Sequence, residues 1–157
     1  MGLISESLVF PEQTFANNEE ALRFLAGKLN AAGKVHDDFF DAVWAREQKF
    51  PTGLPAGKIN VAIPHADAKY VKESAIAVAT LAKPIQFHNM ALTDQELPVS
   101  LIMMLAIHEP HGQVQVLQNV MGLFQDEKHL AQLLSEHDAH TLFTDLDKTL
   151  AGISLDQ

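Results

Sequence analysis

The stretch Val99–Ile107, VSLIMMLAI, is apolar along its whole length apart from Ser100. A strand that is apolar on both faces is typical of the middle of a sheet with helices packed on each side. The stretch is far shorter than the roughly 20 apolar residues that a membrane-spanning helix needs. It therefore predicts a layered α/β domain, with this strand near the centre of the sheet.

Shorter segments elsewhere complete the strand pattern. Ile4–Phe10 alternates weakly and predicts a short strand, and two further strands are expected at Ile59–Ile63, which stops at a proline, and at Ala75–Leu81. The segment Pro51–Gly57 holds two prolines and two glycines, and this density of turn residues favours a surface loop over any strand.

Apolar residues at helical spacing mark the remaining segments. Asn17 and Glu20 resemble a capping box, and Gly33 is placed to end the helix that they begin. We expect residues 1–157 to form a single domain. The expected helices run from Asn17 to Gly33, from Asp37 or Asp38 to Arg46, from His111 to Phe124, from Leu130 to Leu134, and from Asp138 to Leu150.

Composition excludes several classes of protein. The 157 residues carry 11 Lys and Arg against 20 Asp and Glu, a net charge of −9, whereas a nucleic-acid binder needs a basic face. No cysteine is present, so disulfides, thiolate metal sites and sulfur nucleophiles are excluded. The first residues lack the basic and apolar regions of a signal peptide, and we expect a cytoplasmic protein with no insertion into a membrane.

The run His108-Glu109-Pro110-His111 places two imidazoles and a carboxylate at the end of the predicted central strand. Ligands often bind at such strand ends in open α/β sheets, so a metal site is one hypothesis. Pro110 breaks the helical spacing that a zincin site needs, and a third ligand must come from elsewhere.

His65 follows a predicted strand directly, in Ile63-Pro64-His65. Such a histidine is either a core residue whose nitrogens are satisfied by the backbone or a nucleophile, since neutral imidazole has a free lone pair near pH 7. A phosphoryl group on this ring would need nearby cations. Arg46 offers a bidentate guanidinium and His111 a second donor at a helix start, whereas Arg46 could equally be a surface cation at a helix end. Asp67 is expected to be structural or to cap a helix.

These residues resemble a known family. Arg46-Glu47 with Pro51-Thr52-Gly53, followed by Ile63-Pro64-His65, is similar to the signature of enzyme IIA of the sugar phosphotransferase system, fructose and mannitol type. The similarity spans about residues 5 to 150 and continues through Lys83-Pro84-Ile85. Two departures, a longer loop at Gly53–Ile59 and Gly112 after the second histidine, favour the galactitol-like branch.

The resemblance implies a mixed sheet of about five strands between helical layers, and a phosphotransferase that works as a phosphocarrier without cofactor or metal. His65 would be phosphorylated on Nε2, with Arg46 and His111 stabilising the phosphoryl group. The phosphocarrier HPr would be the donor, a cysteine of enzyme IIB the acceptor, and the membrane enzyme IIC an indirect partner in carbohydrate uptake. The alternatives are a regulatory protein of the nitrogen type that signals through phosphohistidine, and a metal-binding protein built on His108 and His111.

Overall fold

The computed structural model describes the backbone of residues 3–150 and the side chains of that range apart from 110–113, 149 and 150. Within it, none of the helices is long and apolar enough to cross a bilayer. In chain order the elements are the 3-10 helix η1 (Glu6–Leu8), β1 (Val9–Gln13), α1 (Asn18–Ala31), α2 (Phe39–Lys49), β2 (Gly53–Ala56), β3 (Ile59–Ala62), the 3-10 helix η2 (Ala68–Tyr70), β4 (Ala75–His88), β5 (Glu96–Ala106), α3 (Pro110–Leu123), α4 (Glu127–Ser135) and α5 (Ala139–Leu150).

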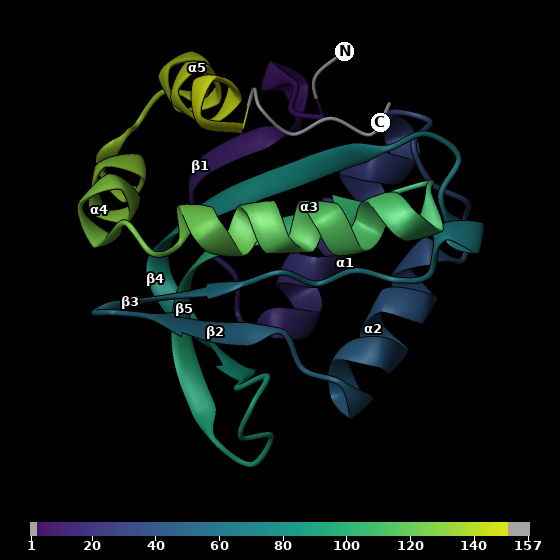
Figure 1. Ribbon diagram of the computed structural model, residues 1–157, viewed down its shortest axis with the longest axis horizontal. Coiled ribbons are helices and arrows are strands. Elements are labelled where there is room, and N and C mark those ends of the chain that lie inside the picture. The colour runs from purple at the N-terminus through teal and green to yellow at the C-terminus, as the bar shows by residue number, and fades with distance from the viewer. Residues whose placement is uncertain (1–2, 151–157) are drawn as a thin grey trace.

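The strands form one mixed sheet in the order β1-β4-β5-β3-β2. β1 is parallel to β4 and β3 is parallel to β5, whereas the β4–β5 and β2–β3 pairs are antiparallel. The predicted apolar strand is β5, which lies in the middle of this order (Figure 1). The expectation of a mixed sheet of about five strands is therefore confirmed.

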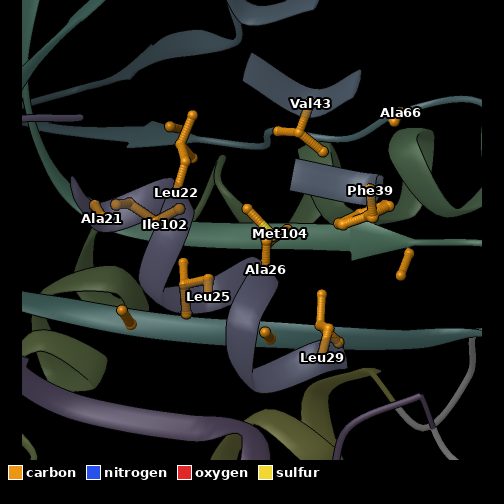
Figure 2. Close-up of a cluster of buried hydrophobic side chains, with 14 of the residues drawn as sticks. Ala21, Leu22, Leu25, Ala26, Leu29, Phe39, Val43, Ala66, Ile102 and Met104 are labelled. Atoms are coloured by element: carbon orange, nitrogen blue, oxygen red, sulfur yellow. The ribbon is translucent and has the colours of Figure 1, made fainter. Parts of the chain in front are cut away.

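Helices cover both faces of the sheet, as expected for a strand that is apolar on both sides. Ile102 and Met104 of β5 point to the face covered by α1 and α2, where they meet the leucines of α1 (Figure 2). Leu101 and Met103 point to the opposite face, into a second core formed with α3, α4 and α5. The alternation of side chains along a strand thus divides one apolar stretch between two cores.

Local signals set the ends of the first helix. The side chain of Asn17 accepts a hydrogen bond of 2.9 Å from the N–H of Glu20, which confirms the predicted cap of α1. Gly33, with φ of +76°, follows the helix in the left-handed conformation that glycine adopts most readily. α2 also lies where the sequence predicts it, with Arg46 in its last turn.

Two predictions are wrong, one of a loop and one of the bounds of a strand, and both concern segments that contain proline. Residues 53–56 form β2, not a surface loop, and β1 begins at Val9 and continues through Pro11. Both strands lie at the edges of the sheet. An edge strand has no neighbour on one side, so a proline, which lacks an N–H, breaks no hydrogen bond there. The segment before β1 forms η1 in place of the expected strand from Ile4.

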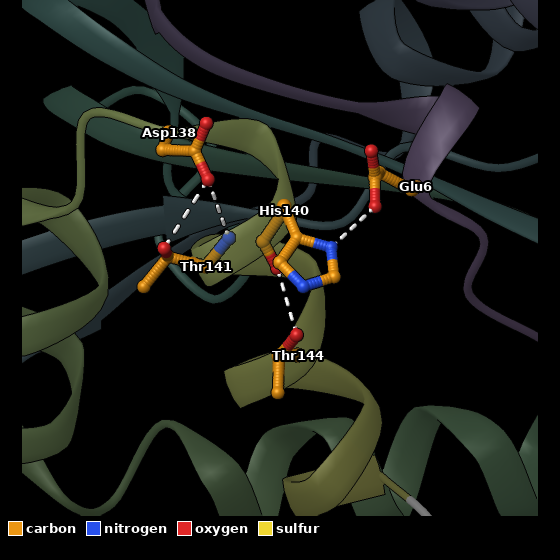
Figure 3. A network of polar contacts seen from close by, with 5 residues as sticks. All are labelled: Glu6, Asp138, His140, Thr141 and Thr144. Atoms are coloured by element: carbon orange, nitrogen blue, oxygen red, sulfur yellow. Dashed lines mark hydrogen bonds and ion pairs between the residues drawn. The ribbon is translucent and has the colours of Figure 1, made fainter.

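A polar contact joins the C-terminal helix α5 to η1 near the N-terminus, and further hydrogen bonds lie within the start of α5 itself (Figure 3). The carboxylate of Asp138 caps it, accepting from the N–H of Thr141 at 3.0 Å, as predicted. His140 Nδ1 lies 2.7 Å from a carboxylate oxygen of Glu6, and this hydrogen bond raises the pKa of His140. α5 is therefore fastened beside β1, at the side of the sheet away from β2 and β3.

Candidate functional site

Two adjacent parallel strands, β3 and β5, end at the same edge of the sheet (Figure 1). His65 follows β3 and pairs with Leu105 of β5, whose N–H donates to the carbonyl oxygen of Pro64 at 3.0 Å. α3 begins at Pro110, four residues after β5 ends at Ala106. The topology thus brings His65 and the first turn of α3, which contains His111, to one edge of the sheet, where ligands of α/β proteins commonly bind.

The imidazole of His65 is held by its own segment of chain. Its Nδ1 atom lies 2.7 Å from the carbonyl oxygen of Ile63. A carbonyl can only accept, so in the neutral ring Nδ1 carries the proton and Nε2 carries the lone pair. Among the described residues, no hydrogen-bond partner faces Nε2. The ring is therefore fixed in the tautomer that leaves Nε2 as the nucleophilic atom.

Burial keeps this ring neutral. Only 6% of His65 is exposed, which is more enclosed than its position after a strand end suggests. Desolvation lowers its pKa, and the positive charge of Arg46 lowers it further, while the Ile63 carbonyl and the Asp67 carboxylate oppose this. The lowered pKa means that the lone pair on Nε2 is available at neutral pH.

Arg46 lies close enough to act on His65 electrostatically. Its Nη1 atom is 3.9 Å from Asp67, two residues beyond the histidine, and the guanidinium lies 5.6 Å from the centre of the Phe50 ring. Its Nε atom is buried and has no hydrogen-bond partner within the described part of the chain. A buried N–H without a partner beside a neutral imidazole is suited to an anion that arrives at the ring.

Glu47 and Thr52 form a buried polar pair that sequence reasoning did not single out. The N–H and the hydroxyl of Thr52 each donate to the Glu47 carboxylate at 2.8 Å. Burial raises the pKa of Glu47 to about 6, although the bonds from Thr52 oppose the shift. The signal was present, since Glu47 follows Phe39 and Val43 at intervals of four and shares their buried face of α2.

The other predicted residues are placed as follows. His111 lies in the first turn of α3, and its side chain is outside the described residues. His108 Nδ1 lies 2.9 Å from the carbonyl oxygen of Val71. Among the side chains that are described, no three His, Cys, Asp or Glu residues gather as metal ligands. Because the metal hypothesis requires His111, it stays a prediction. Asp67 precedes η2 without capping it and pairs with Arg46.

Residues 2–148 match the family described as phosphoenolpyruvate-dependent sugar phosphotransferase system, EIIA 2. The chain belongs to this EIIA family. The resemblance of this chain to enzyme IIA is thereby confirmed, and phosphotransferase activity within a sugar phosphotransferase system is the general activity of the family.

This EIIA chain matches most of one relative and only a small part of another. It is 31% identical over 122 residues to the galactitol-specific EIIA component of Escherichia coli (strain K12), an alignment that covers 78% of this chain and 81% of that protein. It is 29% identical over 150 residues to multiphosphoryl transfer protein 1 of the same strain. That alignment covers 94% of this chain but only 17% of the relative, so this chain spans about one sixth of the multiphosphoryl protein.

The fold of this EIIA agrees with that of solved structures. The crystal structure of IIA mannitol from Escherichia coli superposes with a TM-score of 0.75 at 20% identity, covering 93% of this chain and 97% of the other. At this level of identity the likeness concerns the fold, and it confirms the mixed five-stranded sheet with helices on both sides.

Proposed function

We propose that this EIIA is a phosphocarrier that accepts a phosphoryl group from phospho-HPr on Nε2 of His65 and passes it to a cysteine of an enzyme IIB. The observation that carries the proposal is the hydrogen bond of His65 Nδ1 to Ile63, which leaves the lone pair on Nε2. Since the chain contains no cysteine, the acceptor thiol must belong to another domain or protein.

In the transfer, the lone pair of His65 Nε2 attacks phosphorus in line with the donor's phosphoimidazole. A P–N bond forms to His65 while the P–N bond to the donor breaks, and the donor imidazole leaves with that electron pair. The second transfer forms a P–S bond to the acceptor thiolate and returns the lone pair to Nε2. No step needs a metal or a cofactor, because positioning and charge stabilisation supply the catalysis.

Arg46 and His111 have the supporting roles in this proposal. The guanidinium of Arg46 would hold phosphoryl oxygens through donors that include its Nε–H, which has no hydrogen-bond partner among the described residues. His111 would donate a further hydrogen bond from the start of α3, where the backbone N–H groups of a helix N-terminus also favour an anion. These groups offset the negative charge that phosphorylation adds to a chain already at −9.

The branch and organisation are also proposed. Identity of 31% to a galactitol-specific component supports a galactitol-type carrier, and HPr as donor implies a cytoplasmic location. One sheet shared by both hydrophobic cores supports a single domain over residues 1–157. Enzyme IIC would be an indirect partner.

The alternative is a regulatory protein of the nitrogen type, which would use the same phosphohistidine for signalling. An assay of galactitol uptake with cognate enzymes IIB and IIC separates the two functions, because only a transport component would support uptake.

The direct test incubates the protein with enzyme I, HPr and phosphoenolpyruvate and locates the phosphate by mass spectrometry. We expect one acid-labile, base-stable phosphate on His65, and none in His65→Ala. His108→Ala is a matched control because this second histidine also bonds to a carbonyl oxygen through Nδ1, and it should be phosphorylated normally. Phosphate uptake by His65→Ala would overturn the assignment.

A further inference from the structure

The carbonyl that orients His65 is itself held by a short chain of hydrogen bonds. Ile63 accepts from His65 Nδ1 at 2.7 Å, and its own N–H donates to the carbonyl oxygen of Thr52 at 3.3 Å. This second bond extends the β2–β3 ladder by one step beyond the Gly53–Ala62 pair. The position of the imidazole therefore depends on where the backbone of Thr52 lies.

Thr52 is fixed in turn by Glu47. Both carboxylate oxygens of Glu47 are used, one by the N–H of Thr52 and the other by its hydroxyl, each at 2.8 Å. Glu47 is 5% exposed and Thr52 is 2% exposed, so water cannot replace these bonds. The pair joins the last turn of α2 to the start of β2, and that turn also carries Arg46.

We propose that Glu47 is a positioning residue for His65. Acting through Thr52 and Ile63, it holds the carbonyl that keeps the proton on Nδ1 and so directs the lone pair of Nε2 toward the incoming phosphorus. The importance of Nε2 rests on the proposed function, whereas the control of ring orientation does not.

The energetics of the pair support this role. Burial raises the pKa of Glu47 to about 6, and the bonds from Thr52, together with the charges of His88 and Arg46, lower it. Burying a carboxylate here costs folding free energy that an apolar side chain of similar volume would avoid. In return, its two oxygens accept hydrogen bonds in a fixed geometry from two groups of the same residue, the N–H and the hydroxyl of Thr52.

Long-range ¹⁵N NMR of His65 tests the proposal on the free protein, because it reports which ring nitrogen carries the proton. In the wild type we expect the Nδ1–H form alone. In Glu47→Ala, the Thr52 backbone is released, and we expect a mixture of the two tautomers. Glu47→Gln should restore the wild-type spectrum, since its amide oxygen can accept from the N–H of Thr52 and its amide nitrogen can donate to the hydroxyl.

Rates of phosphorylation from phospho-HPr provide the second readout. For Glu47→Ala we expect kcat to fall on the order of tenfold or more with KM nearly unchanged, because the reacting atom is misplaced while the docking surface is intact. Val43→Ala is the matched control: it truncates a buried side chain one turn earlier on α2, and should lower stability without this loss of rate.

Should Glu47→Ala not fold, Thr52→Val removes one of the two bonds at nearly constant volume, with Thr80→Val as the control for a buried hydroxyl distant from the site. A single Nδ1–H tautomer in Glu47→Ala and Thr52→Val would overturn the proposal. So would an equal loss of rate in Val43→Ala, or no rescue by Glu47→Gln. If the tautomer shifts as expected but the wild type is not phosphorylated, positioning stands and the proposed function fails.

Discussion

Gly53 lies against the main chain of His88 so closely that a β-carbon added to Gly53 would be 2.5 Å from the His88 carbonyl oxygen. The contact lies where β2 begins, beside the last residue of β4, and the carbonyl of Gly53 also accepts from the N–H of Met90 at 2.8 Å. The glycine of the P-T-G segment is therefore required by close backbone approach, next to the residue that Glu47 holds.

We expect Gly53→Ala to destabilise the protein by about 1–3 kcal/mol, because backbone has to move to admit the methyl group. Gly27→Ala is the control, since a β-carbon there meets nothing within 4 Å and alanine in a helix should stabilise by about 0.5–1 kcal/mol. Denaturant unfolding of both variants measures the difference. Equal stability of the two would show that β2 moves away from β4 without cost.

Arg46→Ala should slow phosphorylation of His65 and also raise the pKa of its imidazole, because a nearby positive charge lowers that pKa in the wild type. Arg46→Lys should recover the pKa but not the full rate, since lysine keeps the charge without the bidentate fork. NMR titration and single-turnover transfer measure the two effects separately.

Arg23 is the matched control for this experiment because the chain has only these two arginines. Arg23 lies on α1 and pairs with Glu19 at 3.1 Å on the surface. Arg23→Ala should change neither the pKa of His65 nor the transfer rate. Wild-type behaviour of Arg46→Ala in both measurements would remove Arg46 from the site.

Glu47→Gln should change the pH dependence of stability in a defined window. The pKa of Glu47 is raised in the folded state, from about 4.5 to about 6, so between these values the folded protein binds more protons than the unfolded chain. Wild-type stability attributable to this group therefore falls as pH rises from 4.5 to 6. Glutamine does not titrate, and the stability of the variant relative to wild type should rise across the window by on the order of 2 kcal/mol.

Unfolding by urea at several values between pH 4 and pH 7 measures this difference. The comparison of the two proteins cancels other groups that titrate nearby, including His65. A constant difference between variant and wild type across the window would mean that Glu47 has its ordinary pKa in the fold.

Asp138→Ala should destabilise the protein by about 1 kcal/mol, because the carboxylate accepts from both the N–H and the hydroxyl of Thr141 at the start of α5 (Figure 3). Asp147→Ala removes an exposed carboxylate near the other end of the same helix and should have little effect. Thermal unfolding measures the stability of the two variants. A similar loss of stability in both would mean that the change in net charge, and not the helix cap, causes the effect.

Most helices and the central strand are predictable from sequence because their signals are local. The cap at Asn17, the left-handed Gly33 and the two-faced apolar pattern of Leu101–Met104 depend on neighbours within a few residues. β2 is hard to predict because prolines usually end strands, and its position at the edge of the sheet depends on pairing with β3 and on the order of all five strands.

The site divides in the same way. A histidine after a strand and an arginine in the last turn of a helix are visible in the sequence, whereas their approach to each other depends on how α2 packs with α1 over one face of the sheet. Glu47 lies on the same helical face as Val43, so its burial was open to prediction, but its partnership with Thr52 was not, because nothing in the spacing shows which buried polar groups meet.

The strand that ends before His65, the helix that carries Arg46 and the membership in the EIIA family can thus be inferred from the amino-acid sequence. The burial of the ring, the proton on its Nδ1 atom and the hydrogen bonds from Thr52 to Glu47 appear only once the chain is folded. The reason is physical: backbone conformation follows from interactions within a few residues, whereas desolvation and hydrogen-bond partners arise from segments that folding alone brings together.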